Sequence, residues 1–218
     1  MEKFIIEIKE REKDYRSIPF WSFNGKLNSE RLKKQIGDMH GLGMGGFFMH
    51  AREGLETEYL SDEWFSCIKN CVDEAKKLGM KAWVYDENGW PSGFAGGRML
   101  TDDDYHAVYL HSEKTMKFPN AAYAVYSFDK GTPFLVREDI GEREYLAIYV
   151  LTDGTYVDTL RSDVTRQFIA ETHEKYKKVV GNDFGDVMPG FFTDEPQYYR
   201  GGMPFSKNFE KCFFDKYG

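Results

Sequence analysis

The chain has 218 residues, of which 41% are hydrophobic, and its formal net charge is −7. This length allows a substantial core, and the hydrophobic share argues against disorder. The acidic balance and the absence of a dense Lys/Arg run exclude a surface that follows nucleic-acid phosphates. No stretch approaches the roughly 20 apolar residues that span a bilayer, and residues 1–16 lack the apolar core of a signal peptide. We therefore expect a cytoplasmic protein that binds neither nucleic acid nor membrane.

The first 87 residues alternate between strand and helix patterns. Short apolar runs predict strands, and apolar residues at helical spacing behind Asn28 or Ser29 and behind Ser61 predict capped helices. The predicted strands cover residues 18–25, 44–52 and 80–87, and the helices between them cover 28–43 and 61–79. Strands that are apolar on both faces and alternate with helices indicate a parallel sheet covered by helices.

The helical pattern stops at Pro91 and returns after Leu160. Several runs of alternating apolar and β-prone residues lie between these points, and the Asp153-Gly154 pair is a good two-residue hairpin turn. A connection of this length is rare unless it folds by itself, so we expect a small antiparallel insertion after the third strand. A helix over 162–181, a fourth strand over 187–196 and a last helix over 206–218 then follow.

This order predicts an α/β fold of the (β/α)8 TIM-barrel type, in which only the first four βα units are present. The expected domains are residues 1–98, with the first βα units, residues 99–160, with the β-rich insertion, and residues 161–218, with the continuation of the barrel. Four units are half of a closed barrel. We therefore expect these units to pair either with a second copy of the chain or with a missing C-terminal half of the barrel.

Polar side chains follow every predicted strand of this parallel sheet. They are Asn24, then His50 and Arg52, then Asp86 and Glu87, and finally Asp194 and Glu195. In parallel α/β folds the ligand site lies beyond the carboxyl ends of the strands, where the loops converge. We therefore expect these side chains to line one site.

Carboxylates beside aromatic rings are typical of glycoside hydrolysis. One carboxylic acid protonates the leaving oxygen, and a second carboxylate activates water or attacks the sugar. Glu195 and Glu87 are the candidates for these catalytic roles, with Glu195 favoured as proton donor. Trp90, beside Pro91, is a candidate platform for the apolar face of a sugar.

Each candidate also has a purely structural interpretation. An aspartate at a strand end can cap a helix or hold a loop amide, and Glu87 can form a buried ion pair with Arg52 or Arg98. A lone histidine such as His50 is often a core residue. Clustered acids can also bind a divalent ion such as Ca²⁺, but the EF-hand spacing is absent and the acids in "TDDDY" at 101–105 can form a solvated turn.

Four segments resemble the catalytic barrel of glycoside hydrolase family 106, the α-L-rhamnosidase-like enzymes. They are "PFWSFNGKLNSERLKKQI", "GGFFMHAREGLETEYLSDEW", "EAKKLGMKAWVYDENGWPSGFAGG" and "FFTDEP". The resemblance implies an eight-stranded barrel, hydrolysis with inversion by a glutamate acid and a glutamate base, and calcium that helps to hold the sugar. It implies that Glu195 is the strand-four acid and that His50, Arg52, Asp86, Glu87 and Trp90 line the sugar pocket.

Three functions are consistent with this sequence. The first is a rhamnosidase-like glycoside hydrolase that acts on plant-type oligo- or polysaccharides, with a carbohydrate as its substrate. The second is a non-catalytic carbohydrate-binding barrel fragment. The third is a metal-dependent barrel hydrolase or isomerase, although the strand ends lack the several histidines that such enzymes usually carry.

Overall fold

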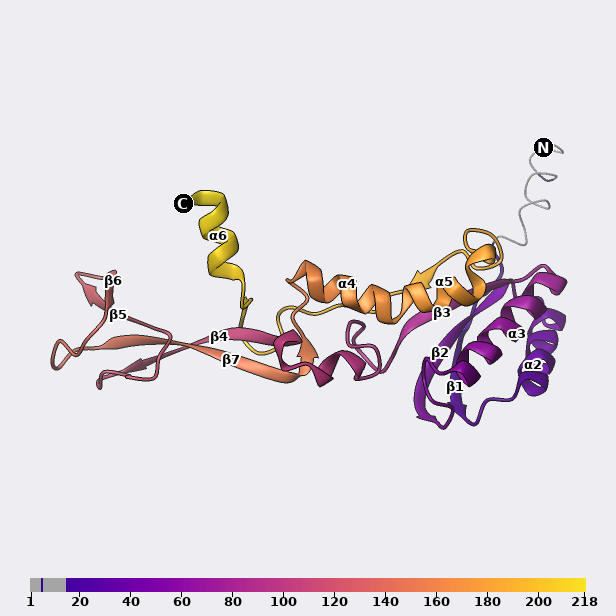
Figure 1. The fold of residues 1–218 in the computed structure, drawn as a ribbon, viewed down its shortest axis with the longest axis horizontal. Helices are drawn as coiled ribbons and strands as arrows, with labels where there is room; N and C mark the ends of the chain where they lie inside the picture. The colour runs from indigo at the N-terminus through magenta and orange to yellow at the C-terminus, as the bar shows by residue number, and fades with distance from the viewer. Residues whose placement is uncertain (1–4, 6–14) are drawn as a thin grey trace. The chain divides into compact units, whose positions relative to one another are not determined.

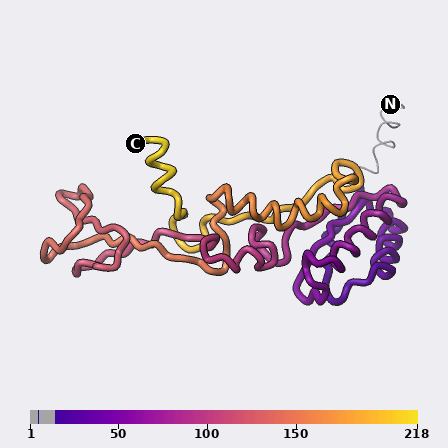
Figure 2. Tube along the Cα trace, in the orientation of Figure 1, coloured from indigo at the N-terminus to yellow at the C-terminus, as the bar shows by residue number. Residues whose placement is uncertain are grey.

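The computed structural model describes residue 5 and residues 15–218. Most of residues 1–16, on which the prediction of no signal peptide rests, lie outside the described residues. The chain folds as two compact units. Unit 1 comprises residues 1–98 and 166–196, and unit 2 comprises residues 99–165 and 197–218. The Cα trace in Figure 2 shows that each unit contains two separate stretches of the chain. Among the described residues, no helix has the length and apolar character needed to cross a membrane.

Unit 1 is built on a parallel sheet of four strands. In spatial order these are β1 (Phe20–Gly25), β2 (Gly46–Leu55), β3 (Lys81–Asn88) and β8 (Phe191–Phe192). The first three follow the predicted strands closely. The fourth is only two residues long and pairs with Val84 and Tyr85 of β3.

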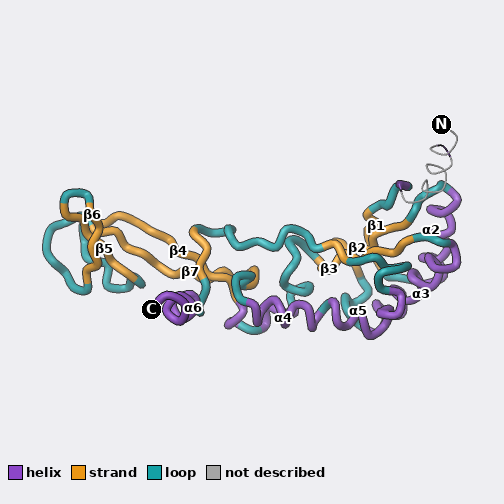
Figure 3. The backbone as a smooth tube through the Cα atoms, turned by 90° about the horizontal axis from the view of Figure 1, so that it is seen from above, coloured by secondary structure: helices purple, strands orange, loops and turns teal. Residues whose placement is uncertain are grey.

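Helices cover one face of this sheet, as Figures 1 and 3 show for α2 (Ser29–Gly41) and α3 (Asp62–Leu78). Asn28 caps α2 by accepting a hydrogen bond from the Arg31 amide, and Ser61 caps α3 through the Trp64 amide, as the sequence predicted. The main core of unit 1 lies between these helices and the sheet. Its fully buried large side chains include Phe23, Ile36, Phe47, Met49, Trp64, Ile68 and Tyr176.

The opposite face of the sheet carries an aromatic surface. Because successive strand residues point to opposite faces, every second side chain of each strand lies on this side. We call this set the aromatic face: Phe20, Phe48, His50, Trp83, Tyr85 and Phe192. The sheet is strongly curved, since the ring centroids of Phe20 and Phe192, on the two outermost strands, are 5.0 Å apart.

The helix predicted over 162–181 is broken into two. Helix α4 (Ser162–Glu171) ends before Thr172, whose φ of −116° and ψ of −83° are not helical, and α5 (His173–Val180) begins directly after it. The Thr172 hydroxyl donates to the carbonyl oxygen of Phe168 at 2.6 Å. Side-chain bonding of this kind competes with the regular helix, and here it accompanies the break at Thr172.

Unit 2 contains an antiparallel sheet of five strands. Their spatial order is β6 (Thr132–Val136), β5 (Ala124–Asp129), β7 (Tyr145–Val157), β4 (His106–Thr115) and β9 (Met203–Phe205). The hairpin turn predicted at Asp153-Gly154 is wrong, because both residues lie within β7 at an irregularity of its register with β4. The two-residue turn is instead Lys130-Gly131, where both residues have positive φ, as a type I′ turn requires.

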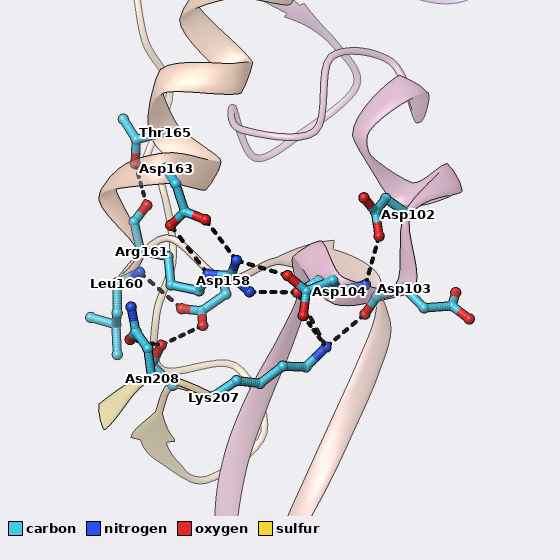
Figure 4. A network of polar contacts seen from close by, with 11 residues as sticks. Asp102, Asp103, Asp104, Asp158, Leu160, Arg161, Asp163, Thr165, Lys207 and Asn208 are labelled. Atoms are coloured by element: carbon cyan, nitrogen blue, oxygen red, sulfur yellow. Dashed lines mark hydrogen bonds and ion pairs between the residues drawn. The ribbon is translucent and has the colours of Figure 1, made fainter. Parts of the chain in front are cut away.

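A network of ion pairs ties the C-terminal part of unit 2 to the acidic "TDDDY" segment (Figure 4). Arg161 contacts Asp104 at 2.8 Å and Asp163 at 2.6 Å, and Lys207 donates to the Asp103 carbonyl at 2.8 Å. The hydrogen bond from Arg161 lowers the pKa of Asp163 to about 2. Asp104 and Asp163 therefore pair with basic side chains, and Asp102 caps the Asp104 amide. Short 3₁₀ turns at Arg98–Thr101, Asp103–Tyr105 and Gly181–Asp183, and helix α6 (Phe209–Tyr217), complete the chain.

The predicted (β/α)8 barrel is wrong. The described residues form a four-stranded parallel sheet with two edges and a separate five-stranded antiparallel sheet, which is a mixed α/β arrangement. After Phe192 the chain does not start another βα unit, because residues 203–205 pair with β4 of the antiparallel sheet. Local patterns predicted the alternation of strands and helices in unit 1, but closure depends on long-range pairing, which these patterns do not encode. The predicted domain boundaries remain a prediction.

Candidate functional site

The adjacent acids Asp86 and Glu87 are both fully buried, but they point to opposite faces of β3. Asp86 lies on the helix side. Its carboxylate accepts hydrogen bonds from Ser92 Oγ at 2.7 Å and Thr193 Oγ1 at 2.6 Å, and His173 Nε2 lies 3.3 Å from its Oδ2. Asp86 therefore holds neighbouring segments together and does not line the aromatic face.

Glu87 anchors the loop that follows β3. Its two oxygens accept hydrogen bonds from five backbone amides: that of Asn88 at the end of β3 and four of the loop, including those of Gly93 at 3.1 Å and Ala95 at 2.8 Å. Burial raises the pKa of Glu87, and the hydrogen bonds from the loop amides oppose that rise. Because both oxygens accept hydrogen bonds from these amides, the geometry gives Glu87 the role of holding this loop.

The aromatic face ends in a linked group formed by His50, Tyr85 and Asp194. The Tyr85 hydroxyl donates to Asp194 Oδ2 at 2.8 Å, and the His50 ring packs on the Tyr85 ring with centroids 3.8 Å apart. Tyr85 thus contacts both His50 and Asp194, two of the side chains that the sequence places at strand ends. Burial and the bond to Asp194 raise the pKa of Tyr85, which keeps it a hydrogen-bond donor.

His50 has an unsatisfied polar atom. Its side chain is 6% exposed, and Nε2 has no hydrogen-bond partner among the described residues. Burial, together with the positive charge of Arg52, lowers the pKa of His50 to about 4. The imidazole is therefore neutral near pH 7. A buried unpaired nitrogen costs about 1–3 kcal/mol, so His50 Nε2 is a candidate contact for a ligand.

The remaining predicted residues, Asn24, Arg52, Trp90 and Glu195, are exposed. No hydrogen bond or ion pair joins any two of them in the part of the chain that the structure describes. Glu195 has φ of 42°, the left-handed region that non-glycine residues rarely adopt. Such strain clusters at functional sites, because the surrounding structure must maintain it. Trp90 is 52% exposed on the loop that Glu87 anchors.

Four residues of this region were missed by the sequence analysis: Tyr85, Ser92, His173 and Thr193. Tyr85 was assigned to a strand interior, and strand alternation could have placed it beside His50. Ser92 lies in the Gly-rich loop, where a small hydroxyl residue carries no signal of its own. His173 was hidden by the prediction of one continuous helix, because only the break at Thr172 turns its ring toward Asp86.

The residues do not fit the calcium ion that the family resemblance implies. Within residue 5 and residues 15–218, no group of three or more His, Cys, Asp or Glu side chains could hold a metal ion. The two buried acids are also occupied, Asp86 by hydroxyl groups and Glu87 by amides. The proton transfer considered for this site therefore uses carboxylic acids and no metal ion.

The low pKa of His50 predicts a pH dependence of stability. The unfolded chain takes up a proton near pH 6.5 and the folded chain only near pH 4, so the contribution of His50 is complete above about pH 6.5 and is lost as the pH falls toward 4. The loss is at most about 1.4 kcal/mol per pH unit. His50→Phe should remove this component of the slope in urea unfolding between pH 7 and 4.5.

A control separates this effect from general loss of packing. Phe48→Leu changes the same aromatic face without removing a titratable group, so it should lower stability and keep the wild-type slope. An unchanged slope in His50→Phe would contradict the low pKa.

Comparison with known proteins gives little to identify the chain. Neither a family model nor a curated protein matches it. The solved structure of a rhamnosidase from Novosphingobium sp. PP1Y is similar to it at 18% sequence identity, over 61% of this chain and 12% of that chain, with a TM-score of 0.39. This chain thus spans about one eighth of that rhamnosidase. The neighbour is distant in both sequence and fold, so it assigns neither a family nor an activity to this chain.

Proposed function

We propose that unit 1 binds a sugar at the strand ends beside its aromatic face, and that the protein is a glycoside hydrolase of the α-L-rhamnosidase type acting on plant-type oligo- or polysaccharides. The observation that carries this proposal is the buried, unpartnered Nε2 of His50 beside the Tyr85–Asp194 hydrogen bond. A sugar hydroxyl can both donate and accept hydrogen bonds. It would therefore satisfy His50 and a carboxylate oxygen of Asp194 together.

The surroundings of this group suit a sugar better than a wholly apolar ligand. Sugar rings have apolar faces that pack on aromatic side chains and hydroxyl groups that need polar partners. The aromatic face supplies rings for the apolar faces of a sugar. Asp194, Asn24 and Arg52 supply polar partners for its hydroxyl groups. The motifs that resemble family 106 enzymes support the same substrate class.

Glu195 is the residue proposed as proton donor. It is exposed, it lies next to Asp194, and no hydrogen bond or ion pair occupies its side chain among the described residues. These properties allow a carboxylic acid to reach the leaving oxygen of a substrate. Glu87 is proposed as a structural residue instead, because its oxygens are already occupied by the loop.

The experiment that tests the sugar site is calorimetric titration of the protein with L-rhamnose. Trp90→Ala should weaken binding about three- to tenfold, because an aromatic platform contributes about 0.5–1.5 kcal/mol beyond its area. Leu42→Ala is the control, since Leu42 is 78% exposed at the C-terminal end of α2, away from the strand ends. Absence of L-rhamnose binding to the wild-type protein would contradict the proposal.

A second candidate function is sugar binding without catalysis. It is favoured by the occupation of Glu87, which removes one of the two carboxylates expected from the sequence. The two functions are distinguished by turnover of 4-nitrophenyl α-L-rhamnopyranoside. Binding of L-rhamnose without release of 4-nitrophenol would support the binding function.

A further inference from the structure

A histidine–aspartate pair lies behind the proposed sugar site, on the helix side of the sheet. His173 Nε2 is 3.3 Å from Oδ2 of the fully buried Asp86. The His173 ring is held edge-on against Phe191 and Phe168, with centroids 4.4 Å and 5.7 Å away. A buried carboxylate is costly unless it is paired, and His173 is the one basic side chain in ion-pair contact with Asp86 among the described residues.

The neighbours of the His173 ring define the role of Nε2. Thr172 Oγ1 lies 2.9 Å from Nδ1, and Nε2 faces a carboxylate oxygen of Asp86, which only accepts hydrogen bonds. A hydrogen bond in this contact therefore uses a proton on Nε2. The contact joins a half-buried histidine to a fully buried carboxylate.

Asp86 connects this pair to the segment that carries Glu195. Its oxygens accept from Thr193 Oγ1 at 2.6 Å and from Ser92 Oγ at 2.7 Å. Ser92 in turn joins the backbone of Asp194 on both sides: its Oγ accepts from the Asp194 amide at 2.9 Å, and its own amide donates to the Asp194 carbonyl at 2.8 Å. The left-handed conformation of Glu195 begins directly after this fixed residue.

We propose that His173 is a positioning residue of the strand-end site: by its contact with Asp86 it fixes residues 193–194 and thereby holds Glu195 in its left-handed conformation. This inference rests on the proposed function only for its effect on catalysis. The positioning itself is a property of the folded chain and can be measured without a sugar.

The test compares two substitutions of His173 in the protein. His173→Gln can place an amide N–H near the position of Nε2, whereas the shorter side chain in His173→Asn cannot reach Asp86. In ¹H–¹⁵N NMR spectra, His173→Asn should shift the backbone amide signals of Asp194 and Glu195, and His173→Gln should restore signals close to those of the wild type. His40→Asn, at an exposed histidine of α2, should leave these signals unchanged.

Kinetic measurements then test whether the position of Glu195 affects hydrolysis. With 4-nitrophenyl α-L-rhamnopyranoside, His173→Asn should lower kcat by about 10- to 100-fold with little change in KM, and His173→Gln should recover most of the loss. Unchanged amide signals in His173→Asn would overturn the positioning role. If the wild-type protein shows no turnover, the proposed catalysis fails, while the amide signals still decide the role of His173.

A measurement on the wild-type protein covers the case in which both variants fail to fold. Long-range ¹H–¹⁵N spectra of the histidine side chains at pH 7 should show a proton on Nε2 of His173, the nitrogen that faces Asp86. A neutral ring with a bare Nε2 would overturn the proposal.

Discussion

Glu195→Gln is expected to abolish hydrolysis of 4-nitrophenyl α-L-rhamnopyranoside while the fold is unchanged. The amide keeps the size of the side chain but cannot give up a proton, and general acid catalysis typically contributes a factor of about 10²–10⁴ in rate. Glu195 is exposed and makes no described hydrogen bond or ion pair, so its replacement should not alter packing. The measurement is kcat together with the urea unfolding midpoint.

Glu30→Gln is the matched control. Glu30 is exposed in the first turn of α2 and forms a surface ion pair with Lys33, so the same chemical change should leave kcat unaltered. Full activity of Glu195→Gln would remove Glu195 from the catalytic role. It would leave the sugar site itself to be judged by L-rhamnose binding.

Glu87→Gln is expected to lower the free energy of unfolding by about 4 kcal/mol, one of the largest effects of any single change in this chain. The substitution removes the charge that five backbone amides share and turns an NH₂ group toward some of those donors. Several buried amides are then left unsatisfied. The measurement is the urea midpoint and m-value, together with amide hydrogen exchange across residues 88–97.

The control for this prediction is Glu53→Gln, an exposed glutamate of β2, which should change stability by less than about 0.5 kcal/mol. If Glu87→Gln instead kept wild-type stability and loop protection but lost activity, the anchoring role would be contradicted. Glu87 would then be restored as a catalytic candidate.

Hydrophobic periodicity and capping residues were sufficient to predict β1 to β3 and helices α2 and α3. Asn28 and Ser61 cap the helices as expected, because an N-cap depends only on residues within one turn. The hairpin at Asp153-Gly154 failed, since the same dipeptide occurs at a bulge between long strands. The break at Thr172 was also missed, because the apolar spacing continues through it.

The sequence predicted which residues of the candidate site lie at strand ends. It did not predict the face on which each side chain lies or the groups that it contacts. Strand alternation already separates Asp86 from Glu87, yet which face receives helices is decided only by the packing of α2, α3 and α5. Four of the five amides that bond Glu87 come from a loop whose path includes positive φ at Gly93, Ala95 and Gly96. No periodic pattern encodes such a path.

The sequence by itself determined the alternation of strand and helix in unit 1, the capped helix starts and the acidic residues at the strand ends, because these depend on contacts within a few residues. Only the tertiary structure decided that the described residues form a four-stranded parallel sheet, that Asp86 contacts His173 and that Glu87 holds the loop. These contacts join residues that lie far apart in the chain, or they depend on the path of a loop. They form only after the sheet and helices have packed, because buried polar groups must then find hydrogen-bond partners.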